Sequence, residues 1–294
     1  MDNKSCCIIT PSYAPDFERC RLLSESIAQF STSNLNHYII VDRRDSLLFN
    51  QLKNQHTTII NKEDILPWWI FQIPTFTKKN IWFSLKTLPV RGWLIQQLIK
   101  LAIAKYIKEE VLIFADSDVF FIRPFDFRQY ISEDGEIRFF REPDVVLENN
   151  RHLPRWYYDA SDLLAIDAPQ FPVANYMGQL VFWKKKNVLK LHQYLEKIHQ
   201  KRWIEVLCNQ WNFSEYILYG VFVEKNLKET SGHYFDSQDL CLNYWEEEPM
   251  SESEIKQFFA NVTSKHIAVM LSAKAGISID KYQQYISASV SENN

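Results

Sequence analysis

Hydrophobic residues recur with two different periods in the first part of the chain. Residues 6–13 and 37–45 are short apolar runs that end in polar residues, a pattern typical of strands buried in a sheet. Residues 17–30, between them, carry apolar side chains at helical spacing, namely Leu22, Leu23, Ile27 and Phe30. A strand, a helix and a second strand in direct succession predict a βαβ unit with a right-handed crossover.

A longer helical pattern and a third strand follow. Residues 91–107 have a broad apolar face and, on the remaining side, a narrow stripe of Trp93, Gln97 and Lys100 at i, i+4 and i+7. The run VLIFADSDVFFIRP at 111–124 is rich in β-branched and aromatic residues, which suits a strand covered on both faces. Residues 1–125 therefore predict an open α/β sheet whose site lies at the carboxyl ends of its strands.

The second half of the chain is less regular. Residues 178–185 and 265–271 predict strands, and residues 187–200 and 251–260 predict helices. The last of these begins with the capping-box pattern of Ser251 and Glu254.

Two further segments predict no regular structure. Residues 61–90 are rich in proline, tryptophan and phenylalanine and predict an irregular stretch, and we expect the tail from Ser287 to fray. We find no internal repeat and no linker rich in glycine or serine. We therefore expect one domain over 1–294, with two halves at 1–125 and 126–294.

Composition narrows the class of protein. The chain of 294 residues is 46% hydrophobic, has a formal net charge of −3 and contains only 6 glycines and 11 prolines, so it can bury a large core. The absence of a basic excess disfavours a nucleic-acid partner. No uninterrupted apolar run approaches about 18 residues, so we expect no transmembrane segment. Five cysteines without CxxC spacing favour a reduced, cytoplasmic protein.

The strongest chemical signal is the pair Asp116 and Asp118 within the apolar run 111–124. Unpaired buried charge is very costly, so either the strand ends here and the carboxylates face a cleft, or a cation compensates them. Residues i and i+2 of a strand point the same way, so we expect Asp116 and Asp118 to converge on one point while Ser117 faces the opposite way. Two hard oxygen donors without histidine or cysteine suit Mn²⁺ or Mg²⁺, whose remaining ligands are commonly substrate phosphates. The alternative is a solvated pair at a strand end.

Three enzyme classes use such a pair. A haloacid-dehalogenase-like phosphatase has an apolar strand followed by DxDxV, which IFADSDVFF at 113–121 matches, with Asp116 then a nucleophile. That class needs further acidic ligands downstream, and the sequence contains no GDxxxD-like segment. A nucleotidyltransferase would need an early triphosphate loop, which TPSYAPDFERC at 10–20 is not. A glycosyltransferase holds a divalent ion on the diphosphate of its donor, and this order of elements fits it best.

The segment RGWLIQQLIKLAIAKYIKEEVLIFADSDVFFIRPFD at 91–126 resembles the core of GT-A-type glycosyltransferases. Together with TPSYAPDFERCRLLSESI, FSEYILYGVF and KHIAVMLSAKAGIS, it more closely resembles an uncharacterised bacterial family of predicted DxD glycosyltransferases. The resemblance implies a GT-A-like, Rossmann-like mixed sheet flanked by helices, and a divalent cation. It also implies a nucleoside-diphosphate sugar donor bound by the nucleotide-sugar-binding half at 1–125. A hydroxyl acceptor would be bound by the irregular acceptor-binding half at 126–294.

The same resemblance implies roles for single residues. In a GT-A-like fold, Thr10, Ser12, Tyr13 and Asp42 line the nucleoside pocket, although ordinary polarity at strand ends accounts for them equally well. Glu215 would be the base that deprotonates the acceptor hydroxyl in an inverting transfer. A buried ion pair or a helix start is the alternative for that carboxylate.

The end of the chain and the helix before the aspartate pair supply further candidates. The glycogenin-like ending HxxGxxKPW is absent, but His266 in looser spacing is a candidate third metal ligand, with Ser272 and Lys274 as diphosphate contacts. Arg91 and Lys100 are candidate donor-binding cations that partly balance the aspartates.

Two aromatic segments and one further alternative complete the prediction. Aromatic-rich residues 66–76 and 151–162 are candidate stacking platforms for sugar rings, with packing under loops as the simpler explanation. A non-catalytic nucleotide- or sugar-binding protein of the same fold would have the same sequence features.

Overall fold

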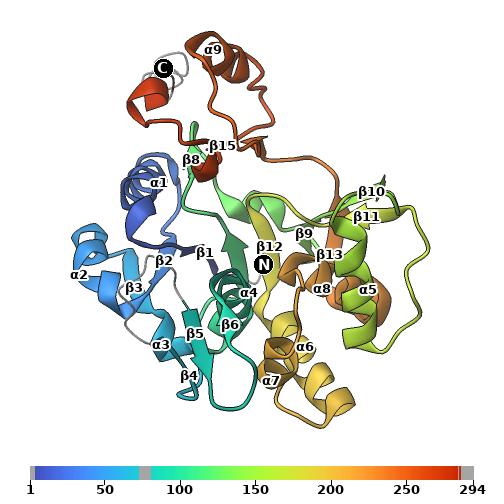
Figure 1. The fold of residues 1–294 in the computed structure, drawn as a ribbon. Coiled ribbons are helices and arrows are strands. Elements are labelled where there is room, and N and C mark those ends of the chain that lie inside the picture. The colour runs from blue at the N-terminus through green and yellow to red at the C-terminus, as the bar shows by residue number, and fades with distance from the viewer. Residues whose placement is uncertain (1–3, 73–80, 284, 286–294) are drawn as a thin grey trace.

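The computed structural model describes residues 4–72, 81–283 and 285, and its centre is a mostly parallel sheet (Figure 1). The sheet has the order β12-β7-β1-β2-β3, in which β12 alone is antiparallel to its neighbour. Its strands are β1 (Cys6–Pro11), β2 (Asn36–Val41), β3 (Thr57–Asn61), β7 (Val111–Phe114) and β12 (Val181–Lys184). Helices cover both faces, so the α/β fold class predicted from the sequence is confirmed.

Alternation along β1 divides the core into two layers. Cys7 and Ile9 pack on one face with the helices that follow β6 and β12, whereas Ile8 packs on the other with α1. The helices around these layers are α1 (Phe17–Phe30), α2 (Ser46–Phe49), α3 (Lys62–Ile65), α4 (Gly92–Ala102), α5 (Leu153–Leu164), α6 (Lys185–His199), α7 (Trp203–Cys208) and α8 (Glu215–Val221). Helix α9 (Glu252–Ala260) packs instead on β8 and β15, outside the central sheet. Burial on both faces explains why these strands are almost uniformly apolar.

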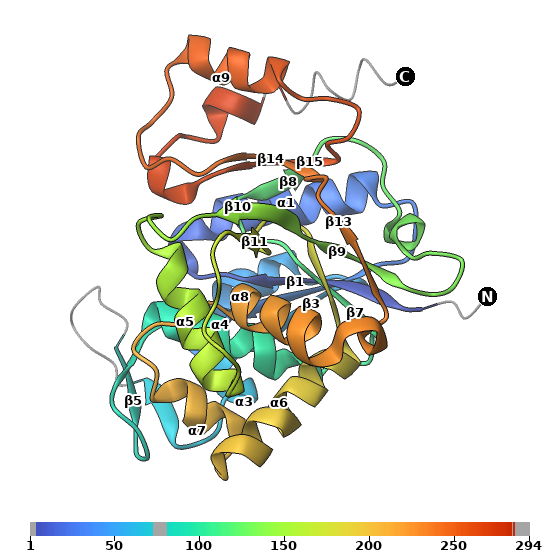
Figure 2. The same ribbon diagram turned by 90° about the vertical axis from the view of Figure 1, so that its right-hand side faces the viewer.

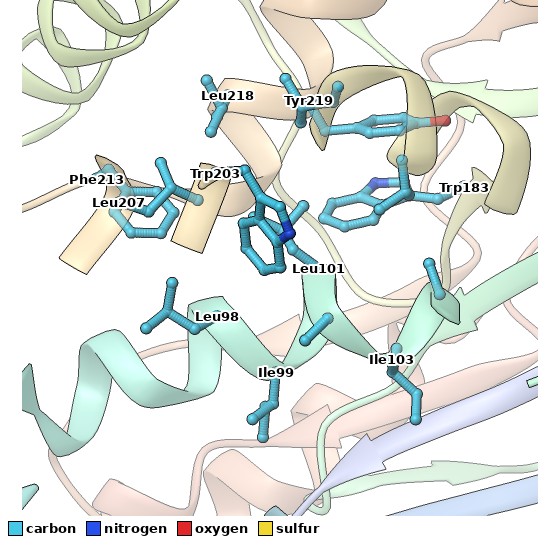
Figure 3. Close-up of a cluster of buried hydrophobic side chains, with 14 of the residues drawn as sticks. Leu98, Ile99, Leu101, Ile103, Trp183, Trp203, Leu207, Phe213, Leu218 and Tyr219 are labelled. Atoms are coloured by element: carbon cyan, nitrogen blue, oxygen red, sulfur yellow. The ribbon is translucent and has the colours of Figure 1, made fainter. Parts of the chain in front are cut away.

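Helix α4 is the centre of the larger layer (Figure 3). Leu98 and Leu101 point toward side chains of α7 and α8, and Trp183 of β12 lies above them. The Trp183 and Tyr219 rings stack with centroids 4.4 Å apart, which ties β12 to α8. The packing holds α4 and α8 side by side, and both helices contribute to the site described below.

Smaller sheets surround this core, and Figure 2 shows β14 and β15 above α1. One contains β8 (Val119–Phe121), β14 (Cys241–Tyr244) and β15 (Ala268–Leu271), a second β9 (Ile137–Phe140) and β13 (His233–Asp236), and a third β10 (Glu142–Val146) and β11 (Val173–Asn175). The strand predicted at 178–185 is the edge strand β12 of the central sheet, so the two halves of the chain share one sheet.

The prediction of an irregular stretch at 61–90 is wrong for most of its described residues. They include helix α3 and an antiparallel sheet of β4 (Ile70–Gln72), β5 (Ile81–Ser84) and β6 (Val90–Arg91). Its buried residues, Trp69 and Trp82 among them, pack on the layer around α4, so tertiary contacts stabilise strands that have little local pattern. Residues 73–76 of the aromatic-rich segment and the tail from Ser287 lie outside the described residues.

Candidate functional site

The two aspartates lie in a turn between strands of different sheets. Strand β7 ends at Phe114 and β8 begins at Val119, whose backbone N–H donates to the carbonyl of Asp116 at 3.1 Å. The premise that one strand continues through both carboxylates is therefore wrong. The chain leaves the central sheet here, and β8 pairs with β15 in another sheet. The Leu271 N–H donates to the carbonyl of Asp118 at 3.3 Å, which extends this pairing to the turn. The sequence left open whether the strand ends at the two aspartates or a cation compensates their charge. In the structure, the strand ends before them.

Asp116 is held by a side chain that lies just before β12. Gln179, which is buried, donates from Nε2 to Oδ2 of Asp116 at 3.0 Å and accepts the Asp116 backbone N–H on Oε1 at 3.1 Å. The two hydrogen bonds fix both the backbone and the carboxylate. The Asp116 side chain is still 40% exposed, so one side of it remains open to solvent.

A buried cation links Asp116 to helix α8. Lys100 is 5% exposed, and its Nζ lies 3.5 Å from Oδ1 of Asp116, 3.0 Å from Oε1 of Glu215 and 2.9 Å from the hydroxyl of Tyr216. Burial by itself lowers the pKa of Lys100, but Asp116, Tyr216 and Glu215 outweigh it and hold the pKa well above the usual value. The ammonium is therefore charged throughout the physiological range.

Asp118 is bound by the loop that follows β15. Its Oδ2 accepts the backbone N–H of Ala273 at 2.9 Å. Burial raises the pKa of Asp118 to about 7, with a further contribution from the negative charge of Asp116, and the Ala273 hydrogen bond only partly opposes the shift. Burial is therefore the main reason that the charged form of Asp118 is disfavoured, and the nearby Asp116 carboxylate adds to the effect.

Asp16 is a third carboxylate at this edge of the sheet. It lies in the turn after β1, accepts a hydrogen bond from the hydroxyl of Ser117 at 3.4 Å and is 4.0 Å from Arg19. Burial raises the pKa of Asp16, Arg19 lowers it, and the charge of Asp116 raises it further. Asp16 in turn adds to the negative potential at Asp118.

These donors fit a hard divalent cation. In the residues that the structure describes, no three histidine, cysteine, aspartate or glutamate side chains are grouped so as to hold a metal ion by themselves. Mg²⁺ and Mn²⁺ are commonly bound through one or two carboxylates, with water and substrate phosphates as the other ligands. Asp116 is partly exposed, and the charged form of Asp118 is disfavoured by burial and by the Asp116 carboxylate, so a cation bound between them would offset both effects.

The predicted nucleoside-pocket residues are placed in different surroundings. Tyr13 is 37% exposed at the carboxyl end of β1, where a ligand can reach it. Thr10 is buried and its hydroxyl pairs with Nε2 of His37 at 3.0 Å. Ser12 is also buried, with its backbone N–H donating to Ile40.

Asp42 directly follows β2, but its carboxylate belongs to an ion-paired cluster. Its carboxylate is fully buried, 2.9 Å from Nζ of Lys62 and 3.5 Å from Arg44. A paired, buried carboxylate of this kind supports the local structure at the end of β2. The structure therefore favours Tyr13, rather than Thr10 or Asp42, as the open polar position beside the first strands.

The candidates from the last strand are divided between its two ends. Strands β15 and β8 run antiparallel with Met270 opposite Val119, so Ser272 and Lys274 follow the end that carries Asp118. His266 lies before the opposite end, where its Nδ1 accepts the backbone N–H of Thr263 at 3.1 Å. The structure does not bring His266 to Asp116 and Asp118. Lys274 is exposed and pairs with Glu247 at 2.9 Å, while Ser272 precedes the Ala273 N–H bound to Asp118.

Arg91 and three tryptophans form an aromatic rim at the start of α4. The Arg91 guanidinium lies over the Trp211 ring at 3.8 Å, and Trp93 stacks on Trp156 of α5 with centroids 6.0 Å apart. Trp93 and Trp211 are exposed. Trp93, Gln97 and Lys100 share one face of α4, so this rim lies about 10 Å along the helix from Lys100.

Sequence reasoning missed Gln179, Asp16 and Tyr216. Gln179 interrupts an otherwise apolar run before β12, which is a weak signal for a buried polar role. Asp16 and Tyr216 carry no motif, and only the packing of β1 and α8 beside the turn brings them to Asp116, Asp118 and Lys100.

The chain matches a family model, described as a family of unknown function (DUF6492), over residues 5–293. It belongs to this family. No curated protein matches the sequence. Among solved structures, the apo form of mouse xyloside xylosyltransferase 1 is similar with a TM-score of 0.46 and 10% sequence identity, over 92% of this chain and 99% of that one.

Membership of the family carries no activity with it, and the low structural similarity supports no functional argument. A functional proposal therefore has to be argued from the residues of the site. In the residues described, every helix is too short or too polar to cross a bilayer.

Proposed function

We propose that the chain is a glycosyltransferase that moves a sugar from a nucleoside-diphosphate sugar to an acceptor hydroxyl with the help of Mn²⁺ or Mg²⁺. The observation that carries the proposal is the acidic turn 116–118 at the carboxyl end of β7. There the pKa of Asp118 is raised to about 7, first by burial and then by the charge of Asp116. Ligands of open α/β sheets bind at this edge, which is where a donor diphosphate would meet the ion.

Asp116 and Asp118 would hold the cation, which when bound supplies Lewis-acid stabilisation to the departing diphosphate. Gln179 and Lys100 orient Asp116 through the contacts at 3.0 Å and 3.5 Å. Ser272 and the loop after β15 border Asp118, so this loop is the proposed diphosphate contact. Tyr13 is the proposed stacking partner of the base, because it is exposed beside β1.

Glu215 could act as the base that deprotonates the acceptor, or it could position Lys100. It is 1% exposed and lies 3.0 Å from Nζ of Lys100, an arrangement that favours positioning of Lys100 over direct contact with an acceptor. The assignment of Glu215 as the base, and with it an inverting reaction, is testable by the anomeric configuration of the product. An inverted product with activity abolished by Glu215→Gln supports the base. A retained product excludes that role.

The primary test is nucleoside-diphosphate release from a panel of nucleoside-diphosphate sugars with Mn²⁺. The wild type should release product, Asp118→Asn should be slower by at least a hundredfold, and the exposed control Asp134→Asn should match the wild type. Equal rates for Asp118→Asn and wild type would defeat the proposal.

The same protein preparations separate the two rival functions. A haloacid-dehalogenase-like phosphatase would release phosphate from small phosphomonoesters and require Asp116. A non-catalytic binding protein would be stabilised against heat by a nucleoside diphosphate and Mn²⁺ without any release of product.

A further inference from the structure

A cavity of about 630 Å³ lies on the side of the molecule formed by α5, the β10–β11 pair and the end of α8. Figure 2 shows these elements next to one another. Neither Asp116 nor Asp118 lines it. Its volume is within the range of ordinary ligand pockets. The walls combine charged side chains with tyrosine rings and prolines, among them Arg141, Tyr157, Asp167, Tyr176, Glu224 and Lys225.

One wall is a connected polar network centred on Glu224. Its Oε2 accepts from Nε of Arg141 at 2.7 Å and from the hydroxyl of Tyr176 at 2.8 Å, and its Oε1 lies 3.1 Å from Nζ of Lys225. The Tyr176 ring is buried and stacks on Phe139, so the network is fixed to the core. Both cations of the cavity are therefore already engaged with a carboxylate.

The backbone around the cavity departs from regular geometry in two places. Helix α8 continues as a π-helix over Phe222–Leu227, and this segment presents Glu224 and Lys225 to the same cavity. Asp144, another lining residue, has a φ of 56°, which is uncommon for a residue other than glycine. Short π-helical segments and left-handed residues occur frequently at functional sites.

The charges and rings of the lining select the class of ligand. Two cations, Arg141 and Lys225, face three carboxylates, Asp144, Asp167 and Glu224, so the wall carries a net charge of −1 and disfavours phosphates and other anions. Carboxylates accept strong hydrogen bonds from hydroxyl groups. The lining side chains of Ile166, Pro169 and Pro172, which are partly or largely exposed, supply apolar surface next to these acceptors. A ring with one apolar face and a hydroxylated edge satisfies both.

We propose that this cavity binds a neutral saccharide that is part of the acceptor, the acceptor role resting on the function proposed above. Two elements connect the cavity to the aspartate turn. Helix α8 begins at Glu215 beside Lys100, and the continuous helical segment reaches Glu224 about 13 Å further on. The segment from Tyr176 to Gln179 runs from the cavity wall to the hydrogen bonds on Asp116.

Binding can be measured without donor or metal. Isothermal titration of the full chain would use neutral trisaccharides of glucose, galactose and mannose, with a uronic-acid trimer and a glucosamine trimer as the anionic and cationic counterparts. We expect at least one neutral trisaccharide to bind at least tenfold more tightly than either charged trimer. Asp167→Ala, at an exposed position, should weaken that binding at least tenfold, whereas the exposed Asp162→Ala on α5 should not.

Each outcome decides the proposal. A folded wild type that binds none of the trisaccharides, or that prefers a charged trimer, overturns it. The same holds if Asp162→Ala and Asp167→Ala bind equally well. A chain that binds the neutral trisaccharide at this cavity but releases no nucleoside diphosphate refutes the proposed transferase and leaves the saccharide site in place, so the two failures are distinguishable.

Discussion

The ammonium of Lys100 lies between the carboxylates of Glu215 and Asp116, at 3.0 Å from Oε1 of the first and 3.5 Å from Oδ1 of the second. The Lys100 and Glu215 side chains are both almost completely buried. This contact joins α4, α8 and the turn after β7, so the buried charge of Lys100 holds Asp116 in place together with the hydrogen bonds from Gln179.

Lys100→Met should destabilise the protein by about 3–5 kcal/mol, because it leaves the buried Glu215 carboxylate without its partner. Urea unfolding at neutral pH measures the loss. The exposed Lys105→Met, from the short helix after α4, should change the free energy of unfolding by no more than about 0.5 kcal/mol. Adding Glu215→Gln to Lys100→Met should recover part of the loss, and strictly additive effects of the two substitutions would show that the residues are not coupled.

The stability of the metal-free protein should fall with rising pH because of Asp118. Its pKa is raised to about 7 in the folded protein, mainly by burial, whereas the unfolded chain has a pKa of about 3.9. Between these values the native state binds a proton that the unfolded state releases, so the free energy of unfolding decreases by up to about 1.4 kcal/mol per pH unit.

Asp118→Asn removes this titration. The variant should therefore gain stability relative to the wild type as the pH rises from about 4 to about 7, and the difference should level off above that range. Urea unfolding at several pH values with a chelator present provides the measurement, with Asp134→Asn as the exposed control. Curves for Asp118→Asn and wild type that stay parallel across this range would contradict the assignment.

Gln179→Leu should lower the affinity for Mn²⁺ about 10- to 100-fold, because outer-shell hydrogen bonds orient ligating carboxylates. The substitution removes both hydrogen bonds from Gln179 to Asp116. Paramagnetic resonance of free Mn²⁺ during titration gives the affinity, and circular dichroism checks that the variant is folded. Gln51→Leu, at an exposed position, serves as the matched control. Unchanged affinity in Gln179→Leu would remove Gln179 from the site.

Gly220→Ala should destabilise the protein although it lies in a helix. Alanine normally stabilises a helix interior by about 1 kcal/mol relative to glycine. Here an added Cβ would overlap the Tyr176 ring, so overpacking costs about 1–3 kcal/mol or more. Thermal unfolding measures the change. In a Tyr176→Ala background the same substitution should be neutral or stabilising, and a loss of equal size in both backgrounds would contradict the contact.

Much of the central sheet could be predicted from the sequence, because strands covered on both faces are uniformly apolar and helix α4 has a strong 3.6-residue period. Strands β4, β5 and β6 were missed, since short antiparallel strands depend on partners that the local pattern does not reveal. The acidic pair was found from the cost of burying charge, but its position in a turn was not, because apolar residues continue on both sides.

The chain by itself determined the order of buried strands and helices and the presence of two carboxylates where the apolar pattern breaks. Only the tertiary structure decided which groups surround them. It placed Gln179, Lys100 and Asp16 beside the pair and left His266 at the far end of β15. The reason is physical: local periodicity reports which face of an element is buried, whereas a site is assembled by contacts between elements that are distant in the sequence.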